Sequence, residues 1–75
     1  MENIIRKISI GSDYKSDAMH YSLGQSVYGG HNIESILFHE KTSNYTIYIK
    51  KDDEVKPWKN FNANMAIAIE YVVEY

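Results

Sequence analysis

The sequence predicts a mostly β protein, a small antiparallel sheet or barrel-like meander of five to six strands. Apolar and polar side chains alternate with a period of two along most of the chain, as in strands with one buried face. Runs of Gly, Asn, Asp and Ser separate the alternating segments at spacings that suit turns. Seven tyrosines, two phenylalanines and one tryptophan, dispersed along the chain, also favour strands.

The length of 75 residues predicts a single domain, residues 1–75. A domain of this size buries only roughly 60% of the surface that its unfolded chain exposes, so its stability is marginal. With no cysteine, disulfides and thiolate metal sites are excluded as a supplement to the core. We therefore expect a homo-oligomer, in which self-association completes the core.

The charge balance limits the partners. Eight Lys and Arg residues stand against ten Asp and Glu residues, so the chain lacks the overall basic field that supports duplex nucleic-acid binding. No apolar run approaches the roughly 18 residues of a membrane span, and the first residues carry charge where a signal peptide needs an apolar core. We expect neither a membrane nor duplex nucleic acid as partner, and a cytoplasmic location.

The first half of the chain predicts two strands. Residues 4–10 alternate on mixed faces, which indicates a partly exposed strand that ends at the turn residues 11–13. Residues 12–18 are polar, and we favour a loop over one short helical turn there. Alternation returns over residues 19–28, where Gly24 indicates either a bulge or a close backbone approach.

The second half begins with Gly29-Gly30, which predicts a hairpin because both residues accept positive φ. A strand with a local irregularity is predicted over residues 32–41. After a turn, residues 45–50 alternate cleanly and give the most regular strand of the sequence. Residues 55–61 predict a short edge strand, since Pro57 cannot donate a hydrogen bond to a neighbouring strand.

The last predicted strand covers residues 65–75, after a turn at residues 62–64, and is long and apolar. Such a strand invites aggregation unless it is paired centrally or shielded by another subunit, and we expect one of these arrangements. Ala66 and Ala68 would allow a neighbouring subunit to approach closely. The alternative is a strand that is tucked under the rest of the sheet.

Catalytic and metal-binding patterns are not found in the sequence. His20, His31 and His39 have no metal-ligand spacing, and residues 52–54, Asp-Asp-Glu, are typical of a solvated hairpin tip. No nucleophile and base stand in a recognisable arrangement, and no glycine-rich loop opens a helix. We expect a protein that is not an enzyme, with no metal and no cofactor.

Residues 12–21 gather hydroxyls, a cation, an imidazole and two aromatic rings. Rings stack on bases, while Lys and Ser contact phosphate oxygens, so these are residue types that hold a nucleotide without catalysis. The alternative is a polar loop with two buried tyrosines. Trp58 with Lys56 and Lys59 forms a second aromatic and basic group, for which the alternative is an anchor of an edge strand. The candidate ligand-binding residues are Ser12, Tyr14, Lys15, His20, Tyr21, Gln25 and Trp58.

Four stretches together resemble small phage proteins: Ile8-Ser9-Ile10-Gly11-Ser12-Asp13-Tyr14-Lys15, Ala18-Met19-His20-Tyr21 with Gly24-Gln25, Trp58-Lys59-Asn60-Phe61 and Ile69-Glu70-Tyr71. Small β-rich phage proteins include the anti-CBASS and anti-Thoeris sponges, non-enzymatic oligomers that sequester the cyclic nucleotide signals of bacterial immunity. The resemblance implies an anti-defence protein of the host-cell cytoplasm that binds a small anionic nucleotide in pockets at subunit interfaces. The mild acidity of the chain departs from what an anion binder prefers. The matching positions are Tyr14, Lys15, His20, Tyr21, Gln25 and Trp58.

A protein-interaction module is the alternative function. Such a module, a phage inhibitor of a host protein or a minor structural component, would use an exposed sheet edge and its tyrosines as contact residues.

Overall fold

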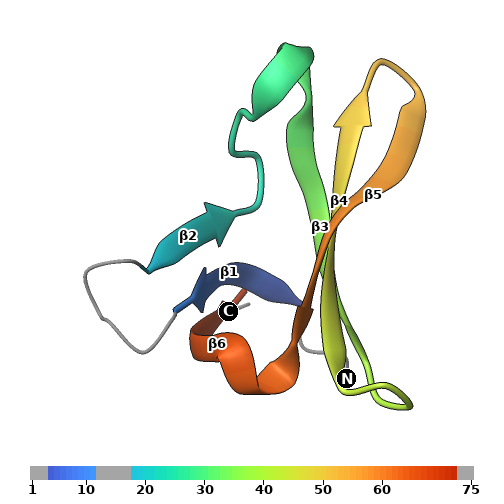
Figure 1. Ribbon diagram of the computed structural model, residues 1–75. Coiled ribbons are helices and arrows are strands. Elements are labelled where there is room, and N and C mark those ends of the chain that lie inside the picture. Colours follow the sequence, from blue (N-terminus) through green and yellow to red (C-terminus); the bar gives the residue numbers. More distant parts are fainter. Residues whose placement is uncertain (1–3, 12–17, 73–75) are drawn as a thin grey trace.

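The computed structural model describes residues 4–11 and 18–72 and confirms a mostly β fold, with two three-stranded antiparallel sheets. The first sheet has the order β2-β1-β6, with β1 at Ile5–Ile10, β2 at Met19–Ser22 and β6 at Ala66–Tyr71. The second has the order β3-β4-β5, with β3 at Asn32–His39, β4 at Asn44–Lys51 and β5 at Glu54–Asn62. In Figure 1, β1 and β2 lie at a steep angle to β3 and β4. Within the described ranges, no helix has the length and apolar character needed to cross a membrane.

Two predictions for the second sheet are confirmed. β4 is the central strand, and its alternation buries Ile47 and Ile49 on one face. β5 is an edge strand, as Pro57 predicts, but with nine residues it is not the short strand that was expected. The pairing register jumps from Ile47 opposite Lys59 to Tyr48 opposite Pro57, which leaves Trp58 as the extra residue of a bulge.

The irregularity predicted in β3 is confirmed as a register shift. Ile33 pairs with Ile49, and the next pair is Ser35 with Tyr48, so Glu34 is the extra residue. Residues three apart in a regular strand lie on opposite faces. The shift brings Ile33 and Ile36 to the same buried face.

The prediction that the first strand is partly exposed holds only at Arg6 and Lys7. β1 is the central strand of its sheet, and Ile5, Ile8 and Ile10 are all buried. The register to β6 shifts between Ile5 and Lys7, so Arg6 is the extra residue and points to solvent. Strict alternation without a bulge would place the charged Arg6 on the same face as Ile8 and Ile10. For this reason the sequence predicts a strand whose faces mix charged and apolar residues.

The strand predicted over residues 19–28 is also wrong beyond Ser22. Gly24 has a φ of +81°, and the Gln25 N–H donates to the Ser22 carbonyl at 3.1 Å, so the chain turns there. The chain then lies against the second sheet, where the Gly24 N–H donates to the Ile33 carbonyl at 2.9 Å. Neither interpretation of Gly24 is the one observed, because a Cβ at this position would have no atom within 4 Å and the residue instead supplies the positive φ of the turn.

The positive φ predicted for Gly29 and Gly30 is confirmed, but the predicted hairpin is reduced to a turn, since no strand of the described chain leads into it. The two residues have φ values of +65° and +80° in the 3₁₀ turn η2, Tyr28–Gly30. A single bridge between Ser26 and Asn32 closes the turn before β3 begins. The loop predicted over residues 12–18 lies, except for Ala18, outside the described residues.

The last strand differs from its prediction. The turn at residues 62–64 is confirmed, since the Asn62 side chain accepts a hydrogen bond from the Asn64 N–H at 3.1 Å, and the 3₁₀ turn η3 spans Ala63–Met65. β6 then follows and, among the described residues, pairs only with β1, so it is an edge strand of the first sheet rather than a central one. The predicted end of this strand, residues 73–75, lies outside the described residues. Shielding of β6 by a second subunit stays a prediction.

Both sheets contribute to one hydrophobic core. The first sheet supplies Ile5, Ile8, Ile10 and Tyr21, and the second supplies Ile33, Ile36, Ile47 and Ile49. Trp58, Phe61 and Ile69 pack against this core from its margin. The aromatic residues at the margin therefore have one side in the core and one toward the surface.

Candidate functional site

Three of the seven predicted ligand-binding residues, Ser12, Tyr14 and Lys15, lie outside the described residues. The other four are placed on three different elements: His20 and Tyr21 on β2, Gln25 after the turn that follows it, and Trp58 on β5. Only two of these side chains are brought together, those of Tyr21 and Trp58.

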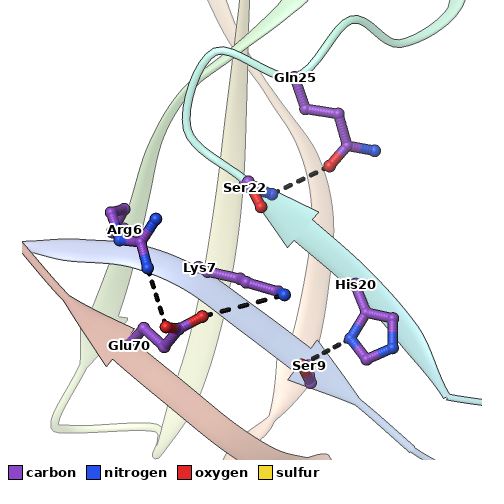
Figure 2. A network of polar contacts seen from close by, with 7 residues as sticks. All are labelled: Arg6, Lys7, Ser9, His20, Ser22, Gln25 and Glu70. Carbon is purple, nitrogen blue, oxygen red and sulfur yellow. Dashed lines mark hydrogen bonds and ion pairs between the residues drawn. The ribbon is translucent and has the colours of Figure 1, made fainter.

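His20 is a cross-strand partner in the first sheet. It pairs with Ser9 of β1, and His20 Nδ1 and Ser9 Oγ share a hydrogen bond of 2.7 Å (Figure 2). A serine and a histidine at this distance have the geometry of a nucleophile and its base. Ser9, however, is buried, with 7% of its surface exposed, whereas His20 is exposed. The pair connects β1 to β2.

Tyr21 points to the opposite face of β2 from His20, because neighbouring residues of a strand alternate. Its ring is 5% exposed in the core, and this burial raises the pKa of the Tyr21 hydroxyl. It contacts the Trp58 ring edge-on, with centroids 5.7 Å apart and an angle of 86° between the planes. The Tyr21 ring therefore packs against Trp58 from the core side of β2, while His20 lies on the outer face of that strand.

Gln25 closes the turn at Gly24. Its side-chain oxygen accepts a hydrogen bond from the Ser22 N–H at 3.0 Å, as Figure 2 shows. The same figure shows Arg6 and Lys7 converging on Glu70 of β6, with N···O distances of 2.8 and 3.9 Å. The two cationic side chains of β1 therefore already have the Glu70 carboxylate as an ion-pair partner.

Trp58 belongs to a cluster that we call the aromatic–basic surface, defined by Tyr28, His31, Lys51, Trp58 and Lys59. The Tyr28 ring lies 5.2 Å from the His31 ring and 6.2 Å from the Trp58 ring, measured between centroids. Lys59 Nζ lies 4.7 Å from the centre of the Trp58 ring, within cation–π distance. Tyr28 is the most open of the three rings, with 56% of its surface exposed.

Local backbone features assemble this surface. The bulge at Trp58 turns its ring toward Tyr21 and Tyr28, which is the usual effect of a bulge on side-chain direction. The glycine turn folds His31 back so that its N–H and Nδ1 lie 3.2 and 3.0 Å from the Tyr28 carbonyl oxygen. A Cβ on Gly30 would lie 3.7 Å from Lys51 Cε, so the lysine stem runs along this turn.

The arrangement combines an open ring with two ammonium groups. Within the described part of the chain, neither Lys51 nor Lys59 forms an ion pair with a carboxylate. A planar base can stack on the Tyr28 ring while the lysines contact phosphate oxygens. The turn residues Asp52 and Asp53 follow Lys51 directly and reduce the local positive potential.

No group of three His, Cys, Asp or Glu residues that could hold a metal ion is found in residues 4–11 and 18–72.

In comparisons with known proteins, the chain matches no family model, no curated protein and no solved structure. The fold and the site define a small all-β protein with two sheets around one core and an aromatic–basic surface at its margin.

Sequence reasoning identified Trp58 and Lys59 as neighbours but missed Tyr28, His31 and Lys51 as their partners. The signal was present in part, since Gly29-Gly30 predicted a turn that brings its flanking residues together. Lys51 and Trp58 lie on neighbouring strands of the second sheet, and each is placed by the same glycine turn: Lys51 runs along Gly30, and Trp58 faces Tyr28.

Proposed function

We propose that this protein is a non-enzymatic binding protein that holds a small anionic nucleotide on the aromatic–basic surface. The observation that carries the proposal is the open Tyr28 ring, 6.2 Å from a Trp58 ring that has Lys59 Nζ 4.7 Å from its centre. Stacking of one base on such a ring contributes about 1–3 kcal/mol. The lysines supply charge-assisted hydrogen bonds to phosphate.

The resemblance to phage anti-defence sponges supports a cyclic nucleotide signal as the ligand. Sequestration requires only that affinity and copy number exceed the free signal, so a small domain is sufficient. The burial of Ser9, the serine that is paired with a histidine, supports binding without turnover. On this proposal the protein acts in the host-cell cytoplasm and releases its ligand unchanged.

Self-association is part of the proposal. The edge strand β6 and the residue that follows it expose the apolar side chains of Ile67 and Val72. Antiparallel pairing of β6 with β6 of a second copy would satisfy the open backbone groups of this edge and cover these side chains. Ile67→Lys is expected to weaken that contact, and sedimentation velocity of both proteins measures it.

The same exposed edge favours a second candidate function, a protein-interaction module that adds a strand of a host protein to β6. The two functions differ in what they need. Nucleotide binding depends on Tyr28 and Lys59, whereas strand addition depends on β6. Variants of the two surfaces therefore separate them.

The test is thermal unfolding of the purified protein with a panel of cyclic dinucleotides, cyclic trinucleotides and cyclic ADP-ribose isomers. A ligand at 100 times its Kd stabilises the folded state by about 2.7 kcal/mol. For a domain of this size that corresponds to a rise of roughly ten degrees or more. Ligand recovered after denaturation is then compared with the starting compound by chromatography.

Two variants and a control locate the site. Tyr28→Leu keeps an apolar side chain but removes the stacking ring, and Lys59→Gln removes one cation; each should reduce the thermal shift. Lys41→Gln removes an exposed cation of the turn between β3 and β4 and should leave the shift unchanged. Altered ligand in the recovered sample would instead indicate an enzyme. No shift with any compound would favour the protein-interaction module.

A further inference from the structure

A cavity lies on a different part of the molecule from the aromatic–basic surface and shares none of its residues. Its volume is about 650 Å³, and its walls come from β1, β3, β4, β6 and the residues beside them. The charged and aromatic side chains that line it are those of Glu34, Phe38, Glu40, Tyr45 and Tyr71. Pockets that bury small ligands have volumes of roughly 300–1,000 Å³, so the size fits a small molecule.

Three aromatic side chains form part of the wall. Phe38 and Tyr45 are direct cross-strand partners of β3 and β4, with ring centroids 4.8 Å apart and planes at 42°. Tyr71 reaches the cavity from β6, opposite Ile5 of β1. Burial, and secondarily the charge of Tyr71, raise the pKa of Tyr45, which agrees with two phenol groups on one wall. The cavity thus joins rings from both sheets.

The charged groups of the cavity all have one sign. Glu34 and Glu40 are its ionisable acidic members, and no Lys, Arg or His stands among the described residues that line it. Glu34 is the extra residue of the β3 bulge, and Glu40 follows the end of the same strand. Two carboxylates beside aromatic faces create a negative potential that suits a cation.

We infer that this cavity binds a small organic cation with an apolar body, such as a quaternary ammonium compound. The ring faces of Phe38, Tyr45 and Tyr71 attract a cation while they cover its alkyl or aryl groups. Glu34 and Glu40 supply the opposite charge. A second copy placed symmetrically on this cavity would bring Glu34 and Glu40 against the same carboxylates, and that repulsion disfavours self-association through it.

The experiment uses three probes that share a benzyl group: benzyltrimethylammonium, benzyl alcohol and phenylmethanesulfonate. Backbone amide shifts of the ¹⁵N-labelled protein are followed during titration with each probe. We expect benzyltrimethylammonium to give saturable shifts at Glu34, Phe38, Glu40 and Tyr71, with an affinity at least about tenfold above that of benzyl alcohol. Phenylmethanesulfonate should give no shifts at these amides.

Three variants test the cause. Glu34→Gln with Glu40→Gln removes both charges and should weaken cation binding about tenfold or more. Phe38→Leu keeps an apolar wall and should weaken the cation more than benzyl alcohol. Asp52→Asn with Asp53→Asn makes the same change of net charge on the β4–β5 turn, outside the cavity, and should alter the affinity less than about twofold.

Several results would overturn the inference. These are equal affinities for cation and alcohol, shifts centred on other residues, or an equal loss in the control at Asp52 and Asp53. The absence of any saturable shift in the unmodified protein would also overturn it, and this comparison of probes does not depend on any variant folding. None of these outcomes bears on nucleotide binding, which uses different residues.

Discussion

Shortening Ile8 to valine should destabilise the whole protein, including the sheet to which Ile8 does not belong. Ile8 lies in β1 of the first sheet and is 0% exposed, in a core that also contains Ile47 and Ile49 of the second sheet. Loss of one buried methylene costs about 0.8 kcal/mol in transfer free energy. The cavity that remains raises the loss toward about 1.5 kcal/mol.

The assay is urea and thermal unfolding followed by two signals. Trp58, the single tryptophan, reports on the second sheet by fluorescence, and far-UV circular dichroism reports on all strands. A loss of about 1 kcal/mol lowers the unfolding midpoint of a domain of this size by roughly 4–8 °C. Because the core is shared, Ile8→Val should lower both midpoints equally.

The matched control is Ile4→Val, the same chemical change at a residue that is 51% exposed and lies outside β6. Its effect should stay within about 0.5 kcal/mol, as is usual for surface positions. If Ile8→Val lowers the circular dichroism midpoint but leaves the Trp58 midpoint unchanged, the two sheets unfold separately. The reasoning from one shared core would then be refuted.

Three further predictions concern the backbone, an ion pair and pH. Gly24→Ala should destabilise the protein by about 1–2 kcal/mol in urea unfolding, because its φ of +81° disfavours a side chain although no atom lies within 4 Å of the new Cβ. Glu70→Gln breaks the pair with Arg6 but should cost less than about 1 kcal/mol in the same assay, since the two side chains are 51% and 55% exposed. Burial raises the pKa of Tyr21 above its ordinary value of 10.0, so the stability that the neutral phenol contributes is complete below that pH and falls as the pH rises through the higher folded-state pKa. Thermal midpoints from neutral to strongly alkaline pH should therefore fall less steeply for Tyr21→Phe, and parallel curves for the two proteins would contradict this cause.

The sequence predicted the fold class and six strands where alternation was uninterrupted. Residues 45–50 are the clearest case, since β4 lies centrally and only one of its faces carries the isoleucines of the core. Bulges at Arg6 and Glu34 change which residues share a face. The irregularity of β3 was predicted from its sequence, whereas the bulge at Arg6 was not. For this reason β1 was predicted to be partly exposed.

The candidate site was harder to predict than the strands. Trp58 and Lys59 are adjacent in sequence, so their association could be predicted locally. Tyr28 reaches Trp58 only because the chain leaves the first sheet at Gly24 and crosses to the second. The burial of Tyr21 likewise depends on contacts with β5, which are distant in sequence.

The pairing of β1 with β6 has a consequence for how the chain folds. The second sheet consists of consecutive strands joined by short turns, so its contacts are local and can form early. Ile8, in contrast, pairs with Ile69, and during synthesis on the ribosome β1 emerges long before β6 does. The apolar residues of β1 therefore stay without their β6 partner until nearly the whole described chain has been made, and closure of the first sheet is expected to be the late step of folding.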